Sequence, residues 1–119
     1  MAVYSKADLV KAVLLKLGTL DPHEAPEAED AESVLLTAQT VLEELYDEGI
    51  VPFDLDGEEI PAPFLTALAF LVALPLVSEY GVSAEREARI EKGADRGYRT
   101  LRRLKASPYY GIPQRADFF

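Results

Sequence analysis

The chain of 119 residues contains no cysteine, no tryptophan and a single histidine, His23. The lack of cysteine excludes disulfides, thiolate metal ligands and cysteine nucleophiles. With one histidine, most zinc sites are excluded, and so is Ser-His-Asp catalysis that does not use His23. The glycines are isolated, so the phosphate-binding patterns G-x-x-x-x-G-K and G-x-G-x-x-G and the G-x-S-x-G elbow do not occur. We therefore expect no catalysis, no metal and no cofactor.

Positive charge is also scarce, and it is unevenly distributed. The chain has 12 lysines and arginines against 21 aspartates and glutamates, which gives a net charge of −9 at pH 7. This balance argues against a dedicated nucleic-acid-binding domain, because such domains are usually strongly basic. Residues 1–60 carry a net charge of −12, whereas residues 61–119 carry +3. The two halves of the chain therefore differ in the sign of their charge.

Long hydrophobic runs are limited to residues 60–77, a stretch of 18 residues without a charged side chain. That length is at the lower limit for spanning a membrane, but Pro61, Pro63 and Pro75 interrupt the run and acidic residues flank it. We therefore expect a buried central helix and no membrane segment. The N-terminal residues lack the basic and apolar regions of a signal peptide, which predicts a soluble protein.

Two helices are expected in the first half of the chain. Ser5 opens a capping box, and Gly18 follows the last apolar residue of the first helix. The second helix is expected to run from about residues 26–28 to Glu48. Its core face follows a 3-4 repeat made of Ala31, Val34, Leu35, Ala38, Val41, Leu42 and Leu45.

Two further helices are expected in the second half. The third helix starts at residues 61–63, ends at residues 79–81 and is kinked at Pro75, which has no N–H to donate. Ser83 caps the fourth helix, which ends near Lys105. Its narrow apolar seam consists of Ile90, Ala94, Gly97, Leu101 and Leu104.

Two segments do not follow a helical pattern. Residues 50–61 alternate in hydropathy around Asp56-Gly57, which predicts a short hairpin or a protruding loop. Residues 107–119 contain two prolines, a glycine and four aromatics without a period. The predicted fold class is therefore all-α: a small four-helix domain over residues 1–106 with a hairpin-like insertion, followed by an extended C-terminal arm over residues 107–119.

Charged residues form two candidate interaction surfaces. A basic stripe recurs at 3-4 spacing along the fourth helix and consists of Arg89, Lys92, Arg96, Arg99 and Arg103. It is either a solvated face with i,i+4 pairs to Glu85 or Asp95, or a surface for phosphates or an acidic protein. An acidic patch, Glu43, Glu44, Asp47 and Glu48, occupies the end of the second helix, where negative charge opposes the helix dipole. We expect this patch to bring a single copy no benefit and to face the basic stripe of a neighbouring copy; unoptimised surface charge is the alternative.

Several stretches occur together in a fixed order. They are a helix ending in LLKLG, an acidic proline loop, AEDAESVLLTAQTVLEELYDEGI, IPAPFLTALAFLVALPLVSEYGVS, a basic helix and a final RADFF. Taken together, the chain resembles the head-to-tail adaptor, or tail accessory factor, family of tailed bacteriophages and related gene-transfer particles. The best-matching parts are the segment from Pro61 to Gly81, with its E-Y-G ending, and residues 115–119.

The resemblance implies a structural protein of the virion, located at the head-to-tail junction and made in the host cytoplasm. Such adaptors form a dodecameric ring beneath the portal protein, extend the channel through which packaged DNA passes, and offer a docking surface to a tail or nozzle protein. Their C-terminal arms bind the portal or the neighbouring copy. The arm anchors implied here are Tyr109, Tyr110, Ile112, Pro113, Arg115, Phe118 and Phe119.

Alternatives remain for both the arm and the stripe. Thirteen extended residues reach at most about 43–47 Å, and exposed aromatics favour the pockets of a partner. Folding of residues 107–119 back onto the parent domain is the alternative for the arm. The alternative for the whole chain is a small helical nucleic-acid-binding module that uses the Arg89–Arg103 stripe.

Overall fold

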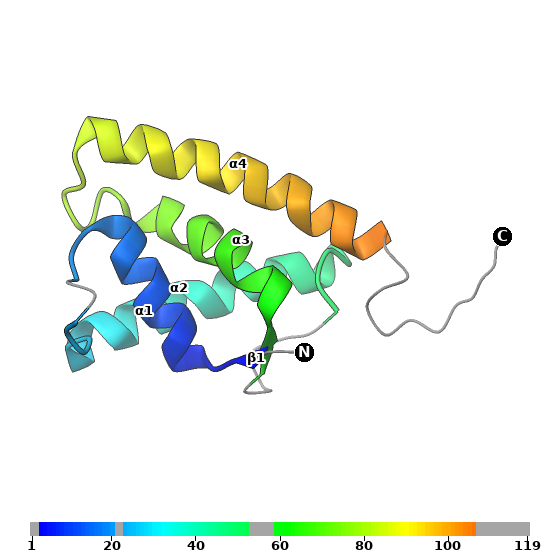
Figure 1. Cartoon of the computed structure of the whole chain (residues 1–119), viewed down its shortest axis with the longest axis horizontal. Coiled ribbons are helices and arrows are strands. Elements are labelled where there is room, and N and C mark those ends of the chain that lie inside the picture. The colour runs from blue at the N-terminus through cyan, green and yellow to red at the C-terminus, as the bar shows by residue number, and fades with distance from the viewer. Residues whose placement is uncertain (1–2, 21–22, 53–58, 107–119) are drawn as a thin grey trace, which may run out of the picture.

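The computed structural model describes residues 3–20, 23–52 and 59–106. These residues form four α-helices and one small two-stranded sheet (Figure 1). In chain order the elements are β1 (Val3–Tyr4), α1 (Lys6–Leu17), α2 (Ala28–Asp47), β2 (Ile60–Pro61), α3 (Ala62–Ala73), the 3₁₀ turn η1 (Leu74–Leu76) and α4 (Ala84–Ala106). The predicted all-α class is confirmed.

Both ends of α1 are fixed as the sequence predicts. The Ser5 hydroxyl accepts a hydrogen bond from the Asp8 N–H at 3.2 Å, and the Asp8 carboxylate accepts from the Ser5 N–H at 2.9 Å. This reciprocal pair satisfies two N–H groups that have no partner within the helix. At the other end Gly18 takes φ = 77°, a left-handed conformation that glycine adopts without a Cβ clash.

The second helix, α2, also follows the predicted periodicity. Val34, Ala38, Leu42 and Leu45 are buried, and the other members of the 3-4 repeat pack partly against the core. Glu29 and Asp30 lie in the first turn, at the positive end of the helix dipole. The chain leaves the helix through Gly49, where φ is 74°. One face of α2 is therefore committed to the core, and the opposite face is exposed.

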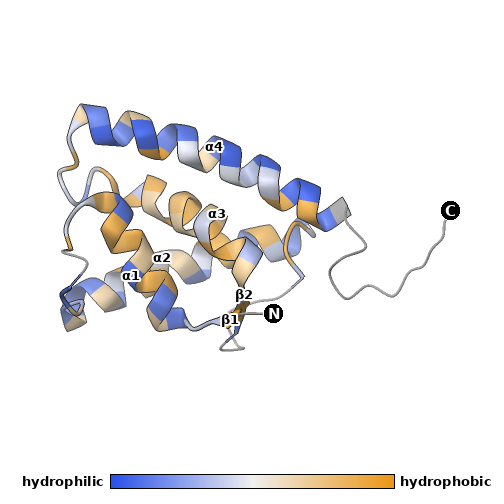
Figure 2. Cartoon of the chain, viewed as in Figure 1, coloured by the Kyte–Doolittle hydropathy of each residue, from blue (hydrophilic) through white to orange (hydrophobic). Residues whose placement is uncertain are grey.

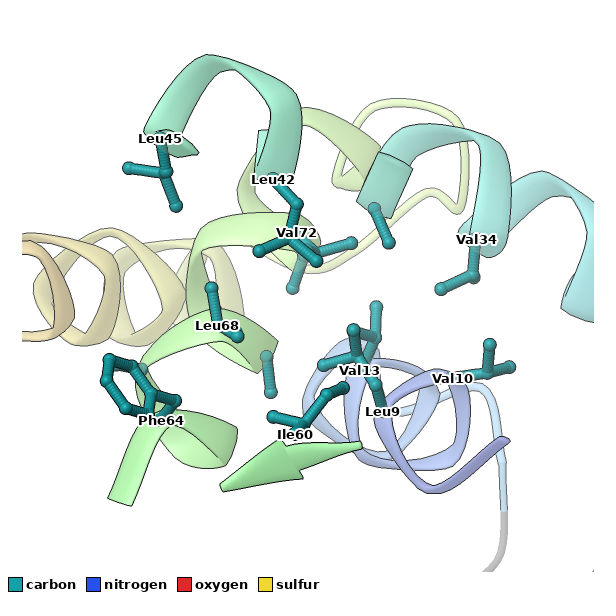
Figure 3. Packing of buried hydrophobic residues seen from close by; sticks show 14 of the residues in the cluster. Leu9, Val10, Val13, Val34, Leu42, Leu45, Ile60, Phe64, Leu68 and Val72 are labelled. Carbon is teal, nitrogen blue, oxygen red and sulfur yellow. The ribbon is translucent and has the colours of Figure 1, made fainter. Parts of the chain in front are cut away.

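Helix α3 is the centre of the domain, because it packs against each of the other three helices. Side chains on several sides of it are buried, among them Phe64, Leu68 and Val72. Figure 3 shows Leu68 and Val72 in one cluster with Leu9 and Val13 of α1 and Leu42 of α2, and Figure 2 shows that α3 is hydrophobic over most of its length. Among the described residues, no helix has both the length and the hydropathy needed to cross a membrane.

The structure differs from expectation at Pro75. Instead of kinking one long helix, the chain ends α3 at Ala73 and continues as the 3₁₀ turn η1, followed by a turn in which Gly81 has φ = 61°. Pro75 cannot donate to the carbonyl of Leu71, and its ring crowds the preceding turn, so regular α-helix stops just before it. The third helix is therefore shorter than predicted.

The strand expected near residue 60 has a different partner from the one a local hairpin would give it. Ile60 and Pro61 pair antiparallel with Tyr4 and Val3. The pairing ties the start of the chain to the start of α3. The predicted turn at Asp56-Gly57 lies outside the described residues, as does the predicted arm over residues 107–119.

Helix α4 lies along α3 and follows the predicted seam (Figure 1). The Ser83 hydroxyl accepts from the Arg86 N–H at 3.2 Å and so caps the helix. Ile90, Ala94, Gly97 and Leu101 are buried, and Leu104 is partly buried. The predicted start, end and buried face of α4 are therefore confirmed.

Candidate functional site

The basic stripe is on the outside of α4. All five of its side chains are exposed, and at about 100° per residue they centre roughly 140° from the buried seam. Two of them form the local pairs expected of a solvated face, Arg89 with Glu85 at 3.8 Å and Arg99 with Asp95 at 2.8 Å. Such exposed i,i+4 pairs contribute only about 0.3–0.5 kcal/mol each. The other three cations, Lys92, Arg96 and Arg103, form no ion pair with any residue that the structure describes.

A groove of about 350 Å³ runs between α3 and α4 and has the basic stripe on one rim. Its apolar floor includes Ala67 and Phe70 of α3 together with Gly93 and Gly97 of α4. The remaining lining residues are Pro63, Thr66, Thr100 and three cations of the stripe, Arg89, Lys92 and Arg96. An apolar floor with a cationic rim suits a ligand that combines an apolar group with negative charge.

The two glycines allow α3 and α4 to approach closely beside the groove. A Cβ on Gly93 would lie 2.6 Å from Cγ of Phe70, and a Cβ on Gly97 would lie 3.0 Å from the Ala67 carbonyl oxygen. Both distances are shorter than van der Waals contact, so the Phe70 ring and the α3 backbone occupy the space of the missing side chains. On its other side the Phe70 ring faces the Lys16 ammonium of α1, 4.7 Å from the ring centroid.

The acidic patch is at the exposed C-terminal end of α2. Glu43, Glu44, Asp47 and Glu48 are all exposed. Contrary to the expectation that this end brings a single copy no benefit, Glu48 accepts a hydrogen bond from the Tyr98 hydroxyl of α4 at 3.4 Å. The Lys105 ammonium also lies 3.7 Å from the position that a Cβ on Gly49 would occupy. Glu48, the C-cap residue of α2, therefore has a hydrogen-bond partner within the chain, while Glu43, Glu44 and Asp47 form no ion pair with a described residue.

The groove and the end of α2 lie on opposite flanks of α4. Tyr98, which contacts the end of α2, and Thr100, which lines the groove, are about 160° apart around the helix axis. The buried seam of α4 lies between these two flanks. One chain therefore cannot place its acidic patch in its own groove.

Helix α2 also carries two exposed apolar side chains. Leu36 is 69% exposed and Tyr46 is 48% exposed. Both residues are off the 3-4 repeat that forms the core face, and Tyr46 lies within the run of acidic residues from Glu43 to Glu48. Sequence reasoning did not single out Tyr46 or the groove. The available signals were an aromatic residue off the core repeat and the G-x-x-x-G spacing of Gly93 and Gly97.

The E-Y-G sequence at the end of the segment from Pro61 to Gly81 has a structural role. The Tyr80 hydroxyl donates to the Asp30 carboxylate at 3.0 Å, and the Ser33 hydroxyl donates to Glu79 at 2.8 Å. These bonds connect the turn after η1 to the first turns of α2. Burial, with the bond to Asp30, raises the pKa of the Tyr80 phenol above its ordinary value.

A second structural contact, between α4 and the end of α1, was not predicted from the sequence. The Arg86 guanidinium of α4 donates to the carbonyl of Lys16 at 3.3 Å, in the last turn of α1. It lies beside Gly18, where it would meet an added Cβ at 2.7 Å. A cation at this end of α1 satisfies an unpaired carbonyl and complements the helix dipole.

Several candidate residues are not positioned by the structure. The arm residues Tyr109, Tyr110, Ile112, Pro113, Arg115, Phe118 and Phe119 all lie outside the described ranges. Within residues 3–20, 23–52 and 59–106, no group of three or more histidine, aspartate or glutamate side chains could hold a metal ion. Comparisons of the chain with protein-family models, with curated proteins and with solved structures gave no match.

Proposed function

We propose that the chain is a head-to-tail adaptor of a tailed bacteriophage or a related gene-transfer particle. It is a structural protein of the virion that assembles as a ring, twelve copies in the family it resembles, beneath the portal protein. The ring extends the DNA channel and offers a surface to a tail or nozzle protein, and no enzymatic turnover is involved. The proposal starts from the order of motifs in the sequence and gains support from the surface of α2 and α4.

The observation that carries the proposal is the separation of two oppositely charged surfaces. The acidic patch of α2 and the basic stripe of α4 are both exposed and lie on different helices. Because the groove beside the stripe is on the flank of α4 opposite to the acidic patch, one chain cannot satisfy both surfaces internally. Two different surfaces that match between copies form a heterologous contact, which closes into a ring or continues as a filament.

The charge distribution also supports assembly on a template. Each copy carries a net charge of −9, so free copies repel one another at low ionic strength. We expect a mainly monomeric protein in dilute solution and a closed ring only on the portal. Sedimentation of the isolated protein measures this directly, and a stable closed ring without portal would contradict it.

Portal binding is the decisive test of the function. Purified portal rings are mixed with full-length protein or with a truncation that lacks residues 107–119, and the complexes are separated by size. Full-length protein should join the portal fraction, and the truncation should join it far less, since buried aromatic anchors often contribute about 2 kcal/mol or more each. Thermal melts should be similar for both proteins, because the four described helices do not include the deleted segment.

Two results would count against the adaptor. Absence of full-length protein from the portal fraction would remove the proposed function. A truncation that still binds portal but melts several degrees lower would instead assign residues 107–119 to the domain itself.

A second candidate function is binding of nucleic acid through the basic stripe. It is favoured by the five exposed cations on one face of α4, three of which have no ion pair with a described residue. If all five contact phosphates of double-stranded DNA, the logarithm of the affinity should fall with the logarithm of salt concentration with a slope of about −4.5. Fluorescence anisotropy with a labelled duplex separates the two functions, because an adaptor should bind free DNA only weakly.

A further inference from the structure

We propose that Tyr46 of one copy inserts into the α3–α4 groove of the next copy, with Glu43 and Asp47 beside the cationic rim of that groove. The inference rests on the proposed function, because it names the contact by which neighbouring copies of the ring recognise each other. It assigns a residue outside the two charged surfaces as the anchor of the contact.

Tyr46 has the properties of such an anchor. Its side chain is 48% exposed at the end of α2, although a tyrosine ring gains substantially from burial. Glu43 is one helical turn before it and Asp47 is the next residue, so carboxylates accompany the ring into any contact. Aromatic residues of this kind, surrounded by polar groups, carry much of the affinity of protein interfaces.

The groove fits this group in size and chemistry. Its volume of about 350 Å³ is sufficient for a phenol ring, and the half-buried Phe70 ring on its floor offers an aromatic partner. Thr66 and Thr100 line the groove and supply hydroxyls for the tyrosine oxygen. The rim cations Arg89, Lys92 and Arg96 complement the two carboxylates, and of these three only Arg89 has an ion pair with a described residue.

The occupant must come from another copy. Tyr46 is near the end of α2, which contacts the Tyr98 flank of α4, whereas the groove opens on the Thr100 flank. Figure 1 shows α2 behind α1 and α3, and the groove floor includes Phe70, which faces α1 through Lys16. Leu36 is also exposed, but it is ten residues, or about 15 Å, before Tyr46 on α2 and away from the acidic patch. Charge therefore favours Tyr46 over Leu36 as the inserted group.

Photo-crosslinking at position 46 tests the contact without the portal. Tyr46 is replaced by p-benzoylphenylalanine, which keeps an aromatic ring, and the full chain is irradiated at high protein concentration. Every copy has both an anchor and a groove, so a head-to-tail contact should give a ladder of dimers, trimers and larger adducts. Mass spectrometry should place the attachment on the peptides that contain Thr66, Phe70 or Thr100. A symmetric face-to-face contact would stop at dimers and would overturn the proposal.

A matched control separates the contact from random collision. Tyr4, which is 37% exposed on β1, receives the same photoreactive group as a matched aromatic site and should give at least about tenfold less adduct at equal concentration. Equal yields from positions 4 and 46, or attachment outside the groove, would overturn the proposal.

A charge exchange provides an independent test. In the photoreactive protein, Arg96→Glu should remove most of the ladder, and the additional change Glu43→Arg should restore it. Both residues are exposed, and neither forms an ion pair with a described residue, so circular dichroism should show an unchanged helical fold. A ladder unaffected by Arg96→Glu, or a loss that Glu43→Arg does not repair, would overturn the contact.

The outcome is distinguishable from that of the proposed function. Portal binding without the position-46 ladder would leave the adaptor standing and remove the Tyr46 contact. A ladder with groove attachment but no portal binding would support the Tyr46 contact and remove the adaptor function.

Discussion

Replacing Gly93 by alanine has two opposing effects on stability. It increases helix propensity, and it introduces a steric clash at the α3–α4 interface. Gly93 is inside α4, where alanine is more favourable than glycine by about 1 kcal/mol. The added Cβ, however, would overlap the Phe70 ring and lie 2.6 Å from its Cγ atom. Because Cγ is the first ring atom, a rotation of the ring about its own axis does not relieve the overlap. The whole side chain of Phe70 must move.

The expected net effect is a loss of stability. Forcing an extra methyl group into a packed interface costs about 1–3 kcal/mol. This cost is larger than the gain of about 1 kcal/mol from helix propensity over most of that range. Displacing Phe70 also disturbs its contact with the Lys16 ammonium, worth about 0.5–1 kcal/mol at an exposed site. We expect Gly93→Ala to lower the free energy of unfolding by about 1 kcal/mol and the melting temperature by about 4 °C.

A second variant makes the cause of this loss testable. In a Phe70→Ala background the ring is absent, so Gly93→Ala should gain the helix propensity alone and stabilise the domain by about 1 kcal/mol. Urea unfolding followed by circular dichroism of the four proteins gives the coupling between the two sites, expected to be about 2 kcal/mol. An effect of Gly93→Ala with the same sign and size in both backgrounds would refute the steric argument. It would also show that the stability of the α3–α4 interface does not depend on the absence of a side chain at Gly93.

Three further predictions concern the ends of the helices. Ser5→Ala should lower the free energy of unfolding by about 1 kcal/mol, measured by urea unfolding, since it removes the N-terminal cap of α1. Arg86→Met should lower it by about 1 kcal/mol by removing the hydrogen bond to the Lys16 carbonyl. Arg86→Lys should recover little of the loss, because a lysine ammonium does not reproduce the planar guanidinium. The folded state raises the pKa of Tyr80 above 10.0, so the stability from this group is present below that pH and is lost as pH rises through the folded pKa. Tyr80→Phe should remove this part of the alkaline decline in the urea midpoint, and an unchanged decline would refute the role of the phenol.

Local signals in the sequence were sufficient for the helices. The caps at Ser5 and Ser83 and the turn at Gly18 depend on neighbouring residues, and the structure confirms all three. The apolar periodicity of α2 and α4 likewise identified the faces that are buried. At Pro75 the sequence identified the point of disruption, but whether the chain bends or ends the helix depends on how η1 packs against α3 and α4.

Contacts between distant segments were not predictable in the same way. The partner of Ile60 is Tyr4, 56 positions earlier in the chain, and nothing in the local pattern of either strand specifies the other. The Tyr98 bond to Glu48 depends on where the end of α2 meets α4, which is a property of the packed domain. The groove could not be derived from periodicity, since it requires that Phe70 and Gly93 meet at the same height of two adjacent helices.

The charge pattern shows how the two kinds of information combine. The sequence places Arg96 on an exposed stripe and Glu43 on an exposed helix end, but it does not say whether the two can meet within one chain. The structure gives the missing relation, because the Tyr98 and Thr100 flanks of α4 face in opposite directions about its axis. An acidic surface held on one flank and a cation-rimmed groove on the other can only be joined between molecules. That directionality is what a head-to-tail series of copies requires, and it ties the ring proposal to a geometric relation between two faces of α4 as well as to net charge.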